Sequence, residues 1–344
     1  MELGLAIGSA QRSGAETTAL AQHAESLGYD SIWTSEAWGS DAFTPLAYMA
    51  AATSTIKLGT AVAQISARTP AATGMTALTL NDLSDQRLQL GLGVSGPQVV
   101  EGWHGVAFGK PLAKTRDYVA IVRLVMAGEE RVEFQGPEYQ VPFLGEGSTG
   151  LGKPLRTTFR VKHTIPILVA AIGPRNVALA IDEADGLLPY LWSPTRWERV
   201  WGEQLSGAKE GYLVAPTVLV AIDDDLEHAR AAVRPQLALH VGGMGARGQN
   251  FYHSLVARYG YEEEANHIQD LYLGGDRAAA IEAVSDELID DLTLVGPPDR
   301  VGQQLEHWRG GPVTTLIADP QSDGTLEALA DVWRRVNMGG SDGG

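Results

Sequence analysis

Residues 167–176, ILVAAIGPRN, carry the clearest sign of a binding site in this sequence. An apolar run ends in small residues, turns through Gly173 and Pro174, and continues into a helical pattern. Small side chains let backbone amides approach a ligand, and a helix start offers free N–H groups and a positive dipole end. We therefore expect an anion such as a phosphate here, to which Arg175 could add a charge. The other interpretation is an ordinary strand–helix turn with a surface arginine.

Two further side chains could move a proton. Glu36 follows an apolar run and stands between Trp33 and Trp38, and desolvation by aromatic neighbours favours the protonated carboxyl group that a proton donor needs. It could equally bond backbone groups or solvent at a strand end. His104 follows another apolar run, and both a functional and a structural role are open for it. Three tryptophans could wall a flat aromatic ligand, although each alone more often packs in a core: Trp38, Trp103 and Trp192.

Other chemical patterns fail on their context. The stretches 91–96 and 243–248 both match the Gly-x-Gly-x-x-Gly fingerprint of dinucleotide sites. After the first match we expect a loop beginning at Pro97 where the fingerprint needs a helix start, and the acidic residue that should follow, Asp117, falls inside a helical pattern. The eight histidines form no metal-binding pattern, and no Gly-x-Ser-x-Gly elbow occurs. We therefore expect no metal and no nucleophilic triad.

The elements that must position these residues alternate between short apolar runs and amphipathic stretches. Eight runs are each followed by a predicted helix: 3–7, 31–34, 57–65, 87–94, 166–171, 186–191, 212–222 and 313–318. Eight such units predict an α/β fold of the (β/α)8 TIM-barrel class, in which active sites lie at the carboxyl ends of the strands. A doubly wound open sheet is the competing fold. We expect one domain over 1–338, with insertions near 131–160, including a β-hairpin at 131–143, and near 226–291, and a disordered tail at 339–344.

Two predicted helices lack the polar face that a barrel helix presents to water. No charged residue occurs from Phe43 to Thr55 or from Thr69 to Asn81. Both helices therefore need a second buried face, and a second copy of the chain is the simplest provider. We expect a homodimer, with cover by the chain's own insertions as the alternative.

Composition excludes several classes of protein. The 344 residues include 42 acidic and 26 basic ones, and the net charge of −16 disfavours a nucleic-acid partner. No apolar run reaches the roughly 20 residues that span a bilayer, and the start of the sequence lacks the pattern of a signal peptide. With no cysteine, disulfides and thiol catalysis are excluded. We expect a cytoplasmic enzyme that acts on a small molecule and needs no membrane.

Three stretches together resemble the bacterial luciferase-like superfamily: LGTAVAQISARTPAA (58–72), LGLGVSGPQVVEGWHG (90–105) and AAIGPRNVALAIDEADG (170–186). More narrowly, they are similar to its oxidoreductases that use the deazaflavin coenzyme F-420 (also written F420), the relatives of methylenetetrahydromethanopterin reductase. The similarity extends from about residue 3 to about residue 337. Other members of the superfamily bind FMN in a similar place, so FMN is the alternative coenzyme.

The resemblance implies a barrel, usually homodimeric, with the deazaflavin lying across the strand ends. Family members carry a non-prolyl cis peptide in a bulge of the third strand behind the ring system, which here corresponds to Ala61 and Val62. The coenzyme's tail and its phosphate would meet the turns after the fourth and fifth strands: Val94, Ser95 and Gly96, then Ala170, Ala171, Gly173 and Pro174, with Arg175 and Asn176 as additions.

One departure from the family pattern bears on the substrate. Relatives acting on alcohols or sugar phosphates have Asp-His after the second strand, whereas this sequence has Glu36 and Ala37, and an alanine cannot move a proton. We therefore favour hydride transfer from the reduced deazaflavin to an electrophilic C=C, C=N or C=O group. Glu36 or His104 would supply the proton, beside Trp38 and Trp192. The alternatives are an FMN-dependent monooxygenase and a flavin-binding protein without turnover.

Overall fold

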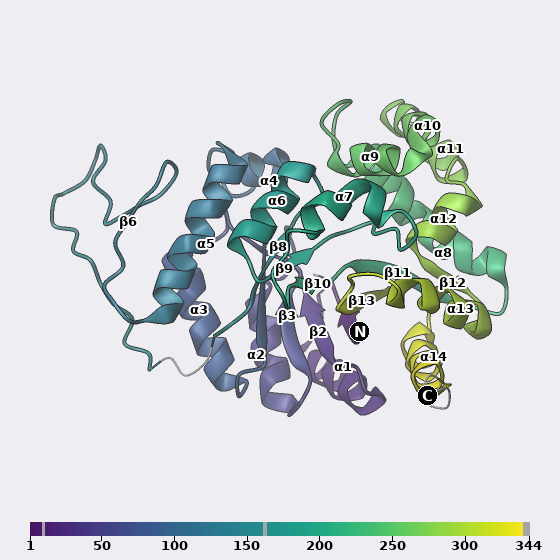
Figure 1. Cartoon of the computed structure of the whole chain (residues 1–344), viewed down its shortest axis with the longest axis horizontal. Coiled ribbons are helices and arrows are strands. Elements are labelled where there is room, and N and C mark those ends of the chain that lie inside the picture. Colours follow the sequence, from purple (N-terminus) through teal and green to yellow (C-terminus); the bar gives the residue numbers. More distant parts are fainter. Residues whose placement is uncertain (9–10, 161–163, 340–344) are drawn as a thin grey trace.

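The apolar runs form a closed barrel of parallel strands (Figure 1). A computed structural model describes residues 1–8, 11–160 and 164–339. Within these ranges, strands at eight positions form the wall of the barrel. The ring closes because β9 pairs with β10, which continues after two residues into β11, and β11 pairs with β13 beside β1. The TIM-barrel prediction is thereby confirmed. The barrel strands are β1 (Glu2–Ala6), β2 (Ser31–Thr34), β3 with β4 (Lys57–Thr60 and Ala63–Gln64), β5 (Leu88–Gly93), β8 (Ile167–Ala170), β9 (Gly186–Leu188), β10 with β11 (Leu213–Val214 and Thr217–Ile222) and β13 (Thr315–Pro320).

A ring of helices covers the outside of the barrel. Helices that follow consecutive strands contact one another from α1 through α7, and α14 returns to contact α1. The caps explain several boundaries, since Ser13 and Glu16 form a capping box at the start of α1, and Gly28 ends it with a positive φ of 88°. The covering helices are α1 (Gly14–Leu27), α2 (Phe43–Ala52), α3 (Pro70–Leu83), α5 (Pro111–Ala127), α6 (Pro174–Glu183), α7 (Trp197–Leu205), α8 (Leu226–Ala238) and α14 (Thr325–Gly339).

A tryptophan fills the barrel interior. Trp33 on β2 is 1% exposed and packs with Leu168, Leu188 and Ile317 from strands around the barrel. The neighbouring strand accommodates the indole only because position 59 is glycine, where a Cβ atom would lie 2.1 Å from the Trp33 ring. The interior below the strand ends is therefore solid, and a ligand must bind above this layer.

The predicted β-hairpin between the fourth and fifth units is confirmed. It consists of β6 (Phe134–Gln135) and β7 (Gln140–Val141), paired antiparallel. Asp117 of α5 is buried and accepts hydrogen bonds from the backbone amides of Glu138 (2.8 Å) and Tyr139 (3.1 Å). This carboxylate therefore ties the hairpin to the barrel, while the rest of the segment projects away from it (Figure 1).

Helices predicted between 226 and 291 are also confirmed. They pack as a separate group beside the barrel (Figure 1), and two of them are π-helical. After α8, this group consists of η1 (Leu239–Gly243), α9 (Phe251–Val256), η2 (Ala257–Tyr261), α10 (Glu262–Leu273), α11 (Arg277–Glu282) and α12 (Asp286–Leu292).

Three short elements differ from the sequence analysis. A short helix, α4 (Pro97–Gly102), begins at Pro97, so the loop expected there is wrong. A strand, β12 (Leu294–Gly296), and a helix, α13 (Pro298–Arg309), follow the helical group. These elements have three to twelve residues, and the shortest carry no readable period.

Within the described ranges, no helix combines the length and apolarity that crossing a membrane requires. The predicted tail begins at Gly339, which is still the last residue of α14, and positions 340–344 lie outside the described residues.

Candidate active site at the carboxyl ends of the strands

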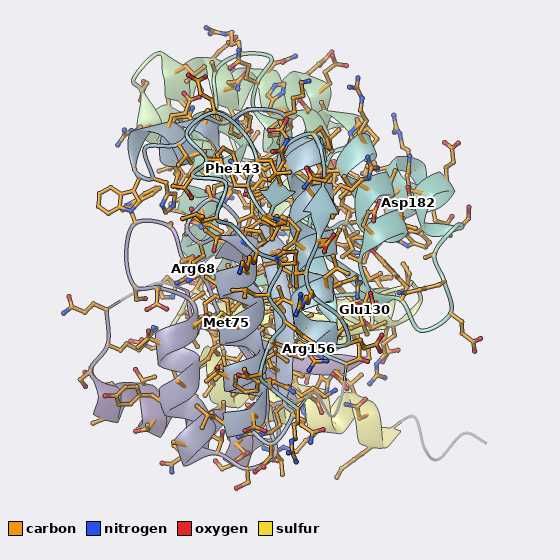
Figure 2. All side chains as sticks on the ribbon, turned by 90° about the vertical axis from the view of Figure 1, so that its left-hand side faces the viewer. Arg68, Met75, Glu130, Phe143, Arg156 and Asp182 are labelled. Atoms are coloured by element: carbon orange, nitrogen blue, oxygen red, sulfur yellow. The ribbon has the colours of Figure 1, made fainter. Side chains whose placement is uncertain are left out.

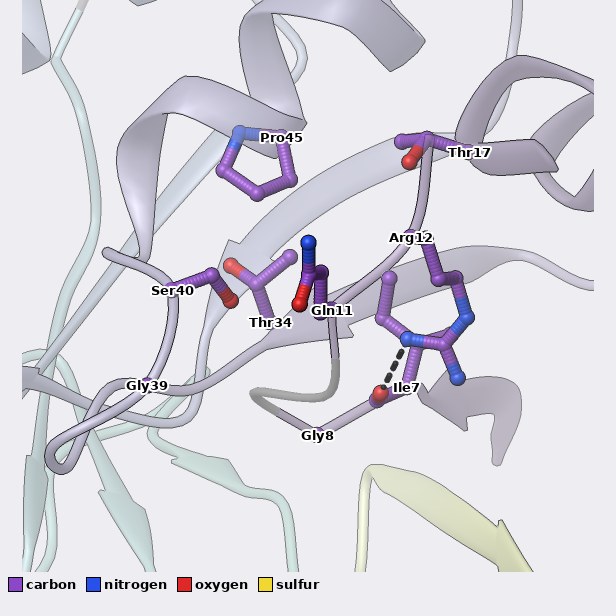
Figure 3. Close-up of a pocket in the computed structure, with 9 residues that line it drawn as sticks. All are labelled: Ile7, Gly8, Gln11, Arg12, Thr17, Thr34, Gly39, Ser40 and Pro45. Carbon is purple, nitrogen blue, oxygen red and sulfur yellow. Dashed lines mark hydrogen bonds between the residues drawn. The ribbon is translucent and has the colours of Figure 1, made fainter. Parts of the chain in front are cut away.

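A pocket of about 360 Å³ opens beside the carboxyl ends of β1 and β2 (Figure 3). It lies between the loops that lead into α1 and α2. Arg12 projects beside it and donates a hydrogen bond of 2.9 Å from Nη1 to the carbonyl oxygen of Ile7. Polar side chains, glycines and aliphatic carbon line it together, which suits a small organic ligand with a few polar groups: Ile7, Gly8, Gln11, Arg12, Thr17, Thr34, Gly39, Ser40 and Pro45.

Glu36 lies in a polar environment rather than the predicted aromatic one. Its carboxylate is 7% exposed and accepts hydrogen bonds from the backbone amides of Ala42 (3.1 Å) and Gln64 (2.8 Å). Arg68 Nη1 lies 2.7 Å from Oε1 and 2.9 Å from Oε2. Two tryptophans were expected around the carboxylate. Trp33 lies in the barrel interior, and Trp38 is two-thirds exposed. These contacts make Glu36 an anchor between the loops after β2 and β4.

His104 is held by a glutamine that the sequence analysis does not name. Its Nε2 lies 2.8 Å from Oε1 of Gln64, and its side chain is half-buried. Gln64 ends β4, is 2% exposed, and donates from Nε2 to the carbonyl oxygens of Glu36 (2.8 Å) and Ala37 (3.2 Å). The two predicted proton-transfer residues are thus brought together through Gln64. Of the two, only His104 keeps a polar side-chain atom, Nδ1, to which no described residue forms a hydrogen bond.

The cis peptide implied by the family resemblance is present. The peptide between Ala61 and Val62 is cis and lies in the gap between β3 and β4. In the turn after β5, Ser95 has a positive φ of 63°, and Val94 and Gly96 beside it are half-buried. These turns lie at the same end of the barrel as His104.

The turn after β8 leaves the start of α6 open. Gly173 is the N-cap residue, no side chain caps the helix, and a Cβ atom at this position would meet nothing within 4 Å. Pro174 and Arg175 are exposed, whereas Ala170 and Asn176 are half-buried and Ala171 is buried. The open backbone amides and the free space fit an anionic group at this helix start.

The three tryptophans proposed as ligand walls have different positions. Trp38 and Trp103 are 67% and 65% exposed in the loops after β2 and β5. Trp192 is 1% exposed and stacks with Trp201 and Trp197, with ring centroids 4.8 and 5.9 Å apart. Trp192 is therefore part of the packed wall, and its assignment to the substrate pocket is corrected.

An acidic residue at the end of β13 was missed by the sequence analysis. Asp319 lies two residues after Ile317 and so shares its inward face of the strand. Burial raises the pKa of the Asp319 carboxyl to about 6. The carboxyl is close enough to Tyr190 to add to the effect of burial, which raises the pKa of that phenol. The only signal in the sequence was an acidic residue directly after an apolar run.

Gln64 and Arg68 were missed for a related reason. Each contributes through one long side chain that reaches another loop, and spacing along the sequence does not encode such contacts. Gln64 left one trace, a polar residue inside the apolar run 57–65. Across the described ranges, no group of three or more histidine or acidic side chains is arranged to hold a metal ion.

Comparison with known proteins agrees with this geometry. Residues 1–315 match the family model described as luciferase-like monooxygenase. The chain is 44% identical over 343 residues to a Mycobacterium tuberculosis protein whose name assigns it provisionally as a coenzyme F420-dependent oxidoreductase, covering 96% of this chain and 98% of that protein. It is 27% identical over 309 residues to 5,10-methylenetetrahydromethanopterin reductase of Archaeoglobus fulgidus, covering 86% of each.

A solved structure has the same fold. The coenzyme F420-dependent tetrahydromethanopterin reductase of Methanopyrus kandleri superposes with a TM-score of 0.79. The match covers 98% of this chain and 99% of that protein at 22% sequence identity.

Proposed function

This chain belongs to the luciferase-like monooxygenase family, and from that premise we propose that it is an oxidoreductase that uses coenzyme F-420. It transfers a hydride to a small organic substrate with an electrophilic C=C, C=N or C=O group. The observation that carries the proposal is the 44% identity, over nearly the whole length of both chains, with a relative named for F420-dependent oxidoreduction.

The backbone at the strand ends fits a deazaflavin. Ala61 and Val62 would support the ring system from the cis peptide, and the turn of Val94, Ser95 and Gly96 would contact the tail. The start of α6 would bind the phosphate, because free N–H groups and open space coincide there. Arg175 is exposed beside that helix start and would add a positive charge.

When bound, the deazaflavin supplies the hydride, so the protein provides position and a proton. His104 is the residue we propose for the proton, because Nε2 is engaged by Gln64 while no described residue forms a hydrogen bond to Nδ1. Trp38 is exposed and precedes Gly39 and Ser40, which line the pocket of Figure 3, and we propose that it covers a substrate there.

The substrate class follows from what position 37 lacks. The family members that oxidise alcohols or sugar phosphates carry a histidine there, whereas Ala37 has no group that exchanges protons. A reduction of an electrophilic double bond needs one proton delivered to the product, and a single imidazole can deliver it.

We also propose that the protein acts as a homodimer. On α2, which has no charged residue, and on α3, which has none before Asp82, Tyr48 and Met75 are 55% and 58% exposed. Figure 2 looks onto this side of the molecule, where Met75 lies at the surface. A second copy that covers these side chains would supply the missing buried face.

Coenzyme binding is tested by titrating the purified protein with F-420, FMN and FAD and measuring fluorescence quenching. We expect saturable binding of F-420 and weak binding of both flavins. Binding of FMN without F-420 would contradict the proposal, and oxygen uptake with reduced FMN would then indicate a monooxygenase. Binding of F-420 without turnover of any electrophilic acceptor tested would indicate a non-catalytic binding protein.

A further inference from the structure

Gln64 has a fixed orientation that follows from its own contacts. Its side-chain nitrogen carries two hydrogens, and both are directed at backbone carbonyl oxygens, those of Glu36 and Ala37. Turning the amide over would place its oxygen against these two oxygens, which is repulsive. Oε1 of Gln64 must therefore face the other way, toward His104.

This orientation decides where His104 carries its hydrogen. Oε1 can only accept, so the imidazole Nε2, 2.8 Å away, must be the donor. In a neutral imidazole with Nε2 protonated, Nδ1 holds the lone pair. No described residue forms a hydrogen bond to Nδ1, so this atom is the one that can take up or release a proton.

Gln64 is itself held rigidly. Its backbone amide donates to Oε1 of Glu36 at 2.8 Å, and the same carboxylate is bridged by Arg68. The Gln64 side chain is 2% exposed, so water does not compete for its hydrogen bonds. The chain of contacts from Arg68 through Glu36 to Gln64 thus supports the imidazole from behind.

We propose that Gln64 is a positioning residue that fixes His104 as the Nε2-protonated tautomer and makes Nδ1 the proton-exchanging atom of the active site. The proposal deepens the proposed function, on which the catalytic role of His104 rests. Gln64 does not touch the reacting atoms. It determines which imidazole nitrogen is available to them, in the way that second partners orient histidines elsewhere.

The tautomer is measured by NMR on protein labelled with ¹⁵N-histidine, at a pH of about 8.5, where imidazole is neutral. The His104 signals are assigned by their loss in His104→Asn. We expect a protonated Nε2, an unprotonated Nδ1 and an imidazole proton that exchanges slowly enough to observe. The opposite tautomer in the wild-type protein would overturn the proposal without any further variant.

Substitution of Gln64 separates positioning from folding. Gln64→Met keeps length but removes the acceptor, and we expect the protected imidazole proton to disappear and the tautomers to interconvert. Gln22→Met is the matched control, because it removes an exposed hydrogen bond of 3.1 Å from the Gln22 side chain on α1 to the carbonyl oxygen of Ala52 on α2. An unchanged His104 spectrum in folded Gln64→Met would contradict the proposal.

Kinetics with F-420 and a reducible acceptor provide the second readout. We expect His104→Ala to lower kcat about 100-fold, and Gln64→Met to lower it at least about tenfold with an unchanged KM for the coenzyme. The double variant should be no slower than His104→Ala. Additive losses would contradict coupling through one imidazole. Absence of F-420 turnover in the wild type would overturn the proposed function and leave the NMR result to decide the role of Gln64.

Discussion

Arg68 Nη1 lies 2.7 Å from Oε1 and 2.9 Å from Oε2 of Glu36, so one nitrogen bridges both oxygens of a carboxylate that is only 7% exposed. The arginine is 23% exposed and lies over the ring of Phe43, 4.8 Å from its centroid. Removing Arg68 leaves this buried carboxylate without its counter-charge. Removing Glu36 leaves the amides of Ala42 and Gln64 without their acceptor, and Arg68 keeps only a longer ion pair with Asp41, at 3.5 Å. Both changes should therefore cost more than losing a surface ion pair.

We predict that Glu36→Ala and Arg68→Ala each lower the free energy of unfolding by about 3 kcal/mol, as expected for a broken buried ion pair. Urea unfolding monitored by circular dichroism measures this. As a control, Lys57→Ala breaks a pair with Glu2 in which both side chains are about 40% exposed, and it should cost less than about 1 kcal/mol. Equal effects of Glu36→Ala and Lys57→Ala would show that Glu36 is not an anchor.

Asp319 should make stability fall with rising pH. Its pKa is raised from 3.8 to about 6 in the folded protein because burial disfavours the charged form. A raised pKa gives a contribution that is complete below about 4 and is lost as the pH rises through about 6. Asp319→Asn removes the ionisation, so the variant should be more stable than wild type at pH 8, by at most about 3 kcal/mol, with no such gain below pH 4.

Unfolding measured from pH 4 to pH 8 tests this sign. Asp185 is the matched control with the opposite behaviour. Although burial opposes it, the Ile167 amide, Lys209 and Arg123 lower the pKa of Asp185. Asp185→Asn should therefore lose stability relative to wild type as the pH rises. A pH-independent difference between Asp319→Asn and wild type would show that Asp319 is ionised throughout this range.

The fold was predictable because its information is local. Each barrel strand is a short apolar run closed by a turn, and caps such as Ser13, Gly28 and Pro70 mark helix ends within a few residues. The cis peptide between Ala61 and Val62 was predicted from the family resemblance, because neither residue type by itself indicates a cis bond.

The site was only partly predictable because its contacts are not local. Glu36 and Arg68 are 32 residues apart, and His104 lies 40 residues from Gln64. Trp192 was assigned to the pocket because it follows a strand end. In the structure, Trp197 and Trp201 stack with it and bury it. Exposure of a large side chain depends on which later helix covers it, and spacing does not contain that information.

The exposed apolar side chains on α2 and α3 predict the effect of a new charge. Met75 is 58% exposed on α3, and Met75→Glu would place a carboxylate inside the proposed dimer interface. We expect wild type to sediment at twice the 36.7 kDa chain mass and the variant to dissociate at least about 100-fold more readily. Leu273→Glu on α10 is the control, since Leu273 is 42% exposed on another helix. A monomeric wild type would contradict the homodimer.

Gly173 separates a requirement of the fold from a requirement of the ligand. Its φ of −81° and ψ of 147° are accessible to any residue, and a Cβ atom would meet nothing within 4 Å. Gly173→Val should therefore change the free energy of unfolding by no more than about 1 kcal/mol. If the open space at this helix start holds the phosphate of F-420, the valine side chain occupies that space. The affinity for F-420, measured by fluorescence titration, should then fall at least about tenfold.

Gly302→Ala in α13 is the control. Its Cβ atom would make only ordinary contacts with Val332 and Val336, so coenzyme binding should be unchanged. Wild-type affinity in a stable Gly173→Val protein would place the phosphate elsewhere, and the turn after β8 would then be an ordinary connection between a strand and a helix.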